Sequence, residues 1–121
     1  MDLGKSVKMP AACIRVRILE DELPLVRTWI ANLVGRSEGV LESMRQEGVS
    51  VESIFLDEHP NAAYLVWYLR SNDLASACRI AQQSQRPIDL YHRAEKERLV
   101  RDRKPMELLA DFNSTSPGPR P

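Results

Sequence analysis

The first apolar pattern along the chain has a period of two residues. Over residues 12–19 the apolar side chains Ile14, Val16 and Ile18 alternate with polar ones, Arg15 and Arg17 among them. Side chains of an extended chain point alternately to opposite faces, so this segment is predicted to be a strand with one apolar and one polar face.

A three-to-four-residue period follows, and it predicts a helix from about residue 20 to 47. Three acidic residues and Pro24 suit the first turn of such a helix. The stripe expected to face a core is Val26, Ile30, Leu33, Ser37, Val40, Leu41 and Met44. Gly35 and Gly39 are expected to kink the helix, and Gly48 is expected to end it.

The rest of the chain predicts a hairpin, two helical stretches and a last strand. The hairpin strands cover residues 49–57 and 62–70, with a turn between them that contains Pro60. The helices are expected over 73–83 and 87–103, and an alternating pattern predicts a strand over 106–112.

The order strand, helix, strand, strand, helix, strand predicts the fold class. Two crossovers around a hairpin give a four-stranded antiparallel sheet with helices on one face, the ferredoxin-like βαββαβ arrangement of α+β proteins. In that arrangement the first strand lies between the third and the last. The expected organisation is a flexible leader over 1–11, one domain over 12–112 and a disordered Pro/Ser-rich tail over 113–121.

The sheet face away from the helices is the expected place for a binding site. Arg15 and Arg17 lie on it and are predicted to neighbour Glu107 and Asp111 of the last strand. Further candidate binding residues are Glu52 on the second strand and, depending on the register of the third strand, Tyr64 or Trp67.

This face allows two interpretations. Guanidinium groups beside aromatic rings could hold a small anionic or enolate-like ligand, or the charges could form weak cross-strand pairs in solvent. Apolar residues also lie on this face. They favour an arrangement in which a second sheet covers the face, supplied by another copy in a homodimer or by a different partner protein.

His92 is the candidate catalytic residue. Asp89 precedes it by three residues on the same helix and could orient the imidazole as a general base, with Tyr91 close by as a binding residue. The alternative is a surface histidine beside a carboxylate that stabilises the first helical turn.

Composition excludes several classes of function. Seventeen basic and seventeen acidic residues balance, and acids interleave with the basic run over 93–104, so nucleic-acid binding is not expected. Two isolated histidines do not supply the converging ligands of a metal site, and no nucleotide-binding or other cofactor motif occurs, so no metal or cofactor is expected. There is no apolar run of about 18 residues, which predicts a cytoplasmic protein without membrane contact.

Three segments carry a resemblance to a known family: residues 48–56, residues 64–70, and the stretch Pro-Ile-Asp-Leu-Tyr-His at 87–92. They resemble a small, mostly uncharacterised prokaryotic family of about a hundred residues, over roughly 12–112. That family is similar to the dimeric α/β-barrel superfamily, in which two such sheets close into one barrel. The superfamily includes cofactor-free monooxygenases, isomerases and cyclases, although a shared fold does not fix function.

Two functional hypotheses follow. The protein could be a small-molecule-binding protein or cofactor-independent enzyme of bacterial metabolism, secondary metabolism included, with proton transfer at a carbonyl-like centre as its specific chemistry. It could instead be a non-catalytic accessory subunit that binds and stabilises a partner enzyme through its open sheet face. A closed cavity with polar groups would favour the first hypothesis and a flat apolar surface the second.

Overall fold

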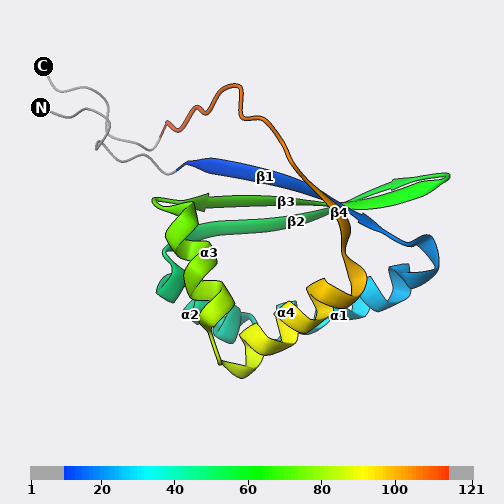
Figure 1. The fold of residues 1–121 in the computed structure, drawn as a ribbon, viewed down its shortest axis with the longest axis horizontal. Coiled ribbons are helices and arrows are strands. Elements are labelled where there is room, and N and C mark those ends of the chain that lie inside the picture. The colour runs from blue at the N-terminus through cyan, green and yellow to red at the C-terminus, as the bar shows by residue number, and fades with distance from the viewer. Residues whose placement is uncertain (1–9, 115–121) are drawn as a thin grey trace, which may run out of the picture.

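The structure is a computed structural model that describes residues 10–114. It is an α+β fold with one four-stranded antiparallel sheet and four α-helices, and the helices all lie beneath one face of the sheet (Figure 1). In chain order the elements are β1 (Ala11–Ile18), the short 3-10 helix η2 (Glu20–Glu22), α1 (Leu23–Gly35), α2 (Ser37–Glu47), β2 (Val49–His59), β3 (Ala62–Ser71), α3 (Leu74–Gln83), α4 (Pro87–Leu99) and β4 (Arg101–Pro105).

The strands lie in the order β2-β3-β1-β4, so β1 sits between β3 and β4 as expected. All three neighbouring pairs are antiparallel. The register places Ile14 opposite Trp67 and Arg15 opposite Val66, which settles the register of β3. The even-numbered apolar residues of β1 therefore face the helices together with Trp67, whereas Arg15 and Tyr64 lie on the outer face.

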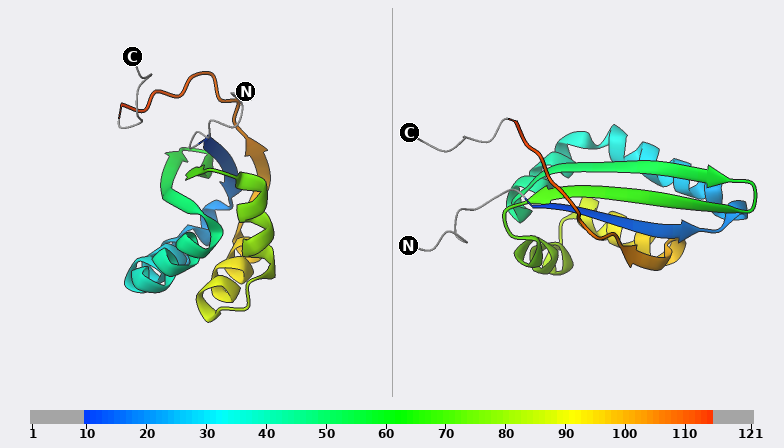
Figure 2. Two further views of the ribbon diagram at one scale, coloured as in Figure 1. Left: turned by 90° about the vertical axis from the view of Figure 1, so that its left-hand side faces the viewer. Right: turned by 90° about the horizontal axis from the view of Figure 1, so that it is seen from above.

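The core fills the space between the sheet and the helices. Trp29 of α1, Leu99 of α4 and Val16 of β1 are its most deeply buried large side chains, and none is more than 1% exposed. Figure 2 shows the helices forming a separate layer under the twisted sheet. Burial of such side chains stabilises a fold by about 1.5–3 kcal/mol each.

The first helical region is two helices rather than one kinked helix. The break falls at Arg36, whose φ of −118° and ψ of 37° lie outside the helical range, between α1 and α2. Gly39 follows the break, and a Cβ there would lie 3.6 Å from the Ile88 side chain of α4, an ordinary van der Waals contact, so the packing of α2 on α4 does not require glycine. Gly48 ends α2 as predicted, with a φ of 78° that favours glycine.

The last strand corrects the prediction. It forms at Arg101–Pro105, directly after α4, and not over 106–112. Helix α4 ends at Leu99 because Val100 already has extended backbone angles. The alternating apolar residues that suggested the later strand are exposed, with Phe112 93% accessible. Glu107 and Asp111 are therefore not strand neighbours of Arg15, and the Asp111 carboxylate instead accepts hydrogen bonds from Arg70.

The segment between α3 and α4 is held by one arginine. The Arg93 guanidinium donates hydrogen bonds to the carbonyls of Ala81, Gln82 and Ser84, at 2.7, 3.0 and 2.9 Å. These carbonyls lie at the end of α3, where no intrahelical donors remain. Arg93 therefore fixes α3 to α4 and so fixes one side of the space beneath the sheet.

The expected leader and tail lie largely outside the described residues, at 1–9 and 115–121. At the domain's start, Ala11 already belongs to β1 and Ser71 N–H donates to the carbonyl of Pro10. Within residues 10–114, no helix has the length and apolar character needed to cross a membrane.

Candidate functional site

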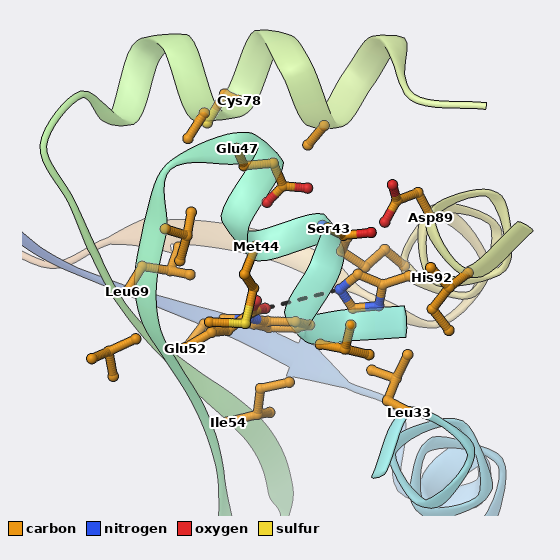
Figure 3. Close-up of a pocket in the computed structure, with 18 of the residues that line it drawn as sticks. Leu33, Ser43, Met44, Glu47, Glu52, Ile54, Leu69, Cys78, Asp89 and His92 are labelled. Carbon is orange, nitrogen blue, oxygen red and sulfur yellow. Dashed lines mark hydrogen bonds and ion pairs between the residues drawn. The ribbon is translucent and has the colours of Figure 1, made fainter. Parts of the chain in front are cut away.

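A cavity of about 650 Å³ lies between the helix-facing side of the sheet and the helices (Figure 3). This volume is in the range of small-molecule sites, roughly 300–1,000 Å³. Most of its wall is apolar. The apolar lining side chains include Ile14, Ile30, Leu33, Val40, Met44, Ile54, Trp67, Leu69 and Ile88.

Ionisable residues interrupt this apolar wall, and five of them lie on α2, β2 and α4. Figure 3 shows Glu47, Glu52, Asp89 and His92 around the cavity, and Lys96 also lines it. They come from the end of α2, from β2 and from α4. The fold thus brings three separate chain segments together at one polar cluster.

The His92 ring packs beside the rings of two tryptophans. Its ring centroid lies 5.5 Å from that of Trp29 and 5.7 Å from that of Trp67. The Trp29 Nε1–H donates a hydrogen bond of 3.2 Å to His92 Nδ1. A neutral imidazole has one donor and one acceptor nitrogen, so the proton of His92 is on Nε2.

Burial keeps this imidazole neutral. Burial, and secondarily the charge of Lys96, lower the pKa of His92 to about 3. Its Nε2 lies 4.0 Å from Oε2 of Glu52, on the cavity side. At neutral pH, His92 therefore presents an N–H donor, and its only lone pair is occupied by Trp29.

Asp89 and His92 make their side-chain hydrogen bonds to other residues, while the charge of Asp89 acts on His92 without a hydrogen bond between them. The Asp89 carboxylate lies in the first turn of α4, where a negative charge is favourable, and it accepts a hydrogen bond from the hydroxyl of Ser84, the residue that follows α3. The partner of His92 Nδ1 is Trp29, from α1. His92 and Asp89 both line the cavity, but the imidazole is arranged as a donor and not as a general base.

Glu52 is on the opposite face of the sheet from the one predicted. It lines the cavity, and its Oε2 accepts a hydrogen bond of 2.7 Å from Trp67 Nε1. Glu52 and Trp67 are thus brought together beneath the sheet. Arg15, Arg17 and Tyr64 remain on the outer face, where the Arg15 guanidinium lies 4.2 Å from the Tyr64 ring centroid.

Glu47 has the acid–base properties that His92 lacks. Burial first, and then the charges of Asp89 and Glu52, raise the pKa of Glu47 to about 7. A carboxyl group that titrates near neutral pH can both accept and return a proton during a reaction. Glu47 is therefore the best-placed proton carrier of the cavity.

Lys96 provides a partly buried positive charge. Burial lowers the pKa of its ammonium group, while the charge of Glu52 opposes that effect. The Nζ atom lies 5.6 Å from the Trp67 ring centroid. In the described part of the chain, the Lys96 ammonium group makes no hydrogen bond and no ion pair within 4.0 Å.

Residues 9–116 match the model of a family of unknown function, DUF6176. The chain belongs to the DUF6176 family. The expectation of a small uncharacterised family is thereby confirmed, whereas the match names no activity. Comparison with curated proteins finds none that matches.

The sequence did not point to three residues of this site, Glu47, Lys96 and Trp29. Glu47 continues the core-facing stripe that runs through Val40 and Met44, and Lys96 lies one helical turn after His92. A charged residue on an apolar stripe was the available signal in both cases. Trp29 gave no such signal, because its hydrogen bond to His92 joins residues 63 positions apart.

Tyr91, the remaining candidate binding residue, lies elsewhere. Tyr91 packs at the margin of the core, and its hydroxyl accepts a hydrogen bond of 2.9 Å from Asn32. It does not line the cavity. Among residues 10–114, no group of three or more His, Cys, Asp or Glu side chains is arranged to hold a metal ion.

Proposed function

We propose that the protein is a cofactor-independent enzyme that binds a small, mostly apolar molecule beneath the sheet and transfers a proton next to a carbonyl-like group. The observation that carries this proposal is the cavity, which combines apolar walls with Glu47 and a fixed N–H donor. Such a combination is typical of small-molecule sites. It favours this hypothesis over a purely accessory role.

The proposed reaction divides the work between two residues. The Glu47 carboxylate takes a proton from the carbon next to the carbonyl, and the C–H electron pair forms a carbon–carbon double bond. The carbonyl π pair moves to oxygen, where the His92 Nε2–H stabilises the developing negative charge. Return of the proton from Glu47 to a different carbon completes an isomerisation, whereas exchange of the Glu47 proton with water before its return gives hydrogen exchange at the original carbon.

Exchange of hydrogen for deuterium tests this proposal directly. Small ketones and oxo acids are incubated in deuterated water, and loss of their α-proton signals is followed by NMR. We expect the protein to accelerate exchange for at least one compound, with a rate that rises as Glu47 loses its proton near pH 7. Glu47→Gln is expected to lower that rate about 10²- to 10⁴-fold.

Two further variants sharpen the exchange test. Glu42→Gln removes the same charge from an exposed position on α2 and is expected to leave exchange unchanged. Ala81→Phe, which adds a ring to the cavity wall, is expected to abolish it. Failure of every compound to exchange above the buffer rate, or equal rates for Glu47→Gln and the unmodified protein, would contradict the proposal.

We also propose that the sheet is of the ferredoxin-like type and that two copies pair through their outer faces. The strand order β2-β3-β1-β4, with β1 beside β4, supports the first part. Phe55, 59% exposed on the outer face opposite Val66, supports the second. A large exposed aromatic side chain is an expected anchor of an interface.

Sedimentation analysis tests the pairing. The unmodified protein is expected to sediment as a dimer, and Phe55→Glu as a folded monomer. A monomeric unmodified protein would contradict pairing. If that monomer still depended on Phe55 to bind and stabilise an enzyme encoded beside it, the accessory-subunit alternative would replace the dimer.

A further inference from the structure

Strand β4 contains an irregularity that redirects one side chain. Arg15 of β1 pairs with Lys104 of β4. Arg17, two residues later in β1, pairs with Arg101, which comes three residues before Lys104 in β4. The additional residue is accommodated at Asp102, whose φ of 51° lies in the left-handed region. Such a β-bulge is a recurrent way to re-aim side chains near a site.

Two adjacent cations of β4 lie on opposite faces of the sheet. Lys104 lies opposite Arg15 on the outer face of the sheet. Consecutive residues of a strand point to opposite faces, so Arg103 is directed to the helix side, and it lines the cavity. Arg103 is exposed where it lines the cavity, and its charge also acts on Lys96.

These two cations have no directly bonded partner of opposite charge, and the charges of Glu52 and Glu47 act on Lys96 only from a longer range. Within residues 10–114, neither the Lys96 ammonium group nor the Arg103 guanidinium makes a hydrogen bond or an ion pair within 4.0 Å. Glu52 Oε2 accepts a hydrogen bond of 2.7 Å from Trp67 Nε1 and none from either cation. Two like charges that converge on one wall repel each other, and an anion between them would remove that cost.

We propose that the ligand of this cavity carries a carboxylate or a similar small anionic group, which Lys96 and Arg103 bind at the β4 side while its apolar body lies along the apolar wall. This inference rests on the proposed function, because it specifies the ligand of the same cavity. Together the two describe an amphipathic oxo acid. Arg103 supplies a planar fork that matches two carboxylate oxygens, and Lys96 supplies a point charge.

A cationic ligand is the main competitor, since three carboxyl groups, those of Glu47, Glu52 and Asp89, also line the cavity. The amine of such a ligand would lie near the like charges of Lys96 and Arg103, and only ionised carboxylates would attract it strongly. Glu47 is only partly charged near neutral pH, because burial raises its pKa to about 7. The other two carboxylates, of Glu52 and Asp89, already accept hydrogen bonds from Trp67 and Ser84, whereas the two cationic groups make none, so the anionic ligand is favoured.

Three probes of one chain length test the proposal: octanoate, octanol and octylamine, each titrated calorimetrically at pH 7.5. We expect octanoate to bind at least tenfold more tightly than octanol, and octylamine to bind most weakly. Arg103→Gln and Lys96→Met are each expected to remove most of the preference for octanoate while octanol binding remains. Lys104→Gln, an equal loss of charge on the other face, is the matched control and should keep the preference.

The outcomes separate this inference from the proposed function. Equal binding of octanoate and octanol, tighter binding of octylamine, or equal effects of Arg103→Gln and Lys104→Gln would overturn the anionic ligand, even if the protein catalyses deuterium exchange. A preference for octanoate that depends on Arg103, without exchange in any compound, would support the ligand class and overturn the reaction. If none of the three probes binds, the inference is overturned.

Discussion

Replacing Trp29 by alanine is expected to lower the free energy of unfolding by about 3–5 kcal/mol. The side chain is fully buried at the centre of the core, 0% exposed, and its removal leaves a cavity that the surrounding helices and sheet cannot fill. Urea denaturation measures the change. Leu99→Ala, at an equally buried position, is the matched control and should cost about 2–5 kcal/mol.

The more conservative Trp29→Phe separates packing from the hydrogen bond. Phenylalanine keeps a ring in the core but cannot donate to His92 Nδ1. Because that hydrogen bond favours the neutral imidazole, its loss should raise the pKa of His92 by about one unit. NMR titration of the His92 ring measures this value. An unchanged pKa in Trp29→Phe, or an equal rise in Leu99→Ala, would show that Trp29 does not fix the protonation of His92.

Stability is expected to depend on pH through two opposing groups. The pKa of His92 is lowered to about 3 in the folded protein, against 6.5 for the free side chain. The unfolded chain therefore binds this proton more readily, so the contribution of neutral His92 is complete above pH 6.5 and is lost as the pH falls to 3. For this largely buried group the effect is on the order of 2–4 kcal/mol.

Glu47 acts in the opposite direction. Its pKa is raised from 4.5 to about 7, so the folded protein binds this proton more readily than the unfolded chain. Its contribution is complete below pH 4.5 and is lost as the pH rises to 7. Because the carboxyl group is only partly buried, the effect is about 1–3 kcal/mol after allowance for solvent screening.

The sum of the two titrations gives a distinctive stability profile. Considering these groups alone, the free energy of unfolding should rise with pH up to 4.5, stay nearly constant from 4.5 to 6.5, and fall slightly towards 7. Glu47→Gln should extend the rise up to pH 6.5 and remove the later fall. Denaturation series across this range measure both profiles, and a Glu47→Gln profile parallel to that of the unmodified protein would contradict the assignment.

The local patterns of the sequence predicted most of the fold, but not the last strand. The two-residue period of Ile14, Val16 and Ile18 predicted β1 and the face that it buries. Strand β4 has no such signal, because Arg101–Pro105 contains four charged residues and a proline. It forms by pairing with β1, and this tertiary interaction leaves no apolar alternation in the sequence.

The site could be predicted only in part, for a related reason. His92 and Glu52 were identified as candidates, but their partners are the tryptophans of distant elements. The face on which Glu52 lies depends on which side of the sheet the helices cover. That choice is made by the packing of the whole sheet, not by the pattern within β2. The functional roles of all these residues remain predictions.

The tryptophan pair beside His92 has a practical consequence for spectroscopy. The chain contains two tryptophans, Trp29 and Trp67, and their ring centroids lie 5.8 Å apart at the polar end of the cavity. All tryptophan fluorescence of the protein therefore originates next to the proposed ligand site. Entry of a molecule should alter the polarity around Trp67, so the intensity and wavelength of emission can report occupancy without any attached dye.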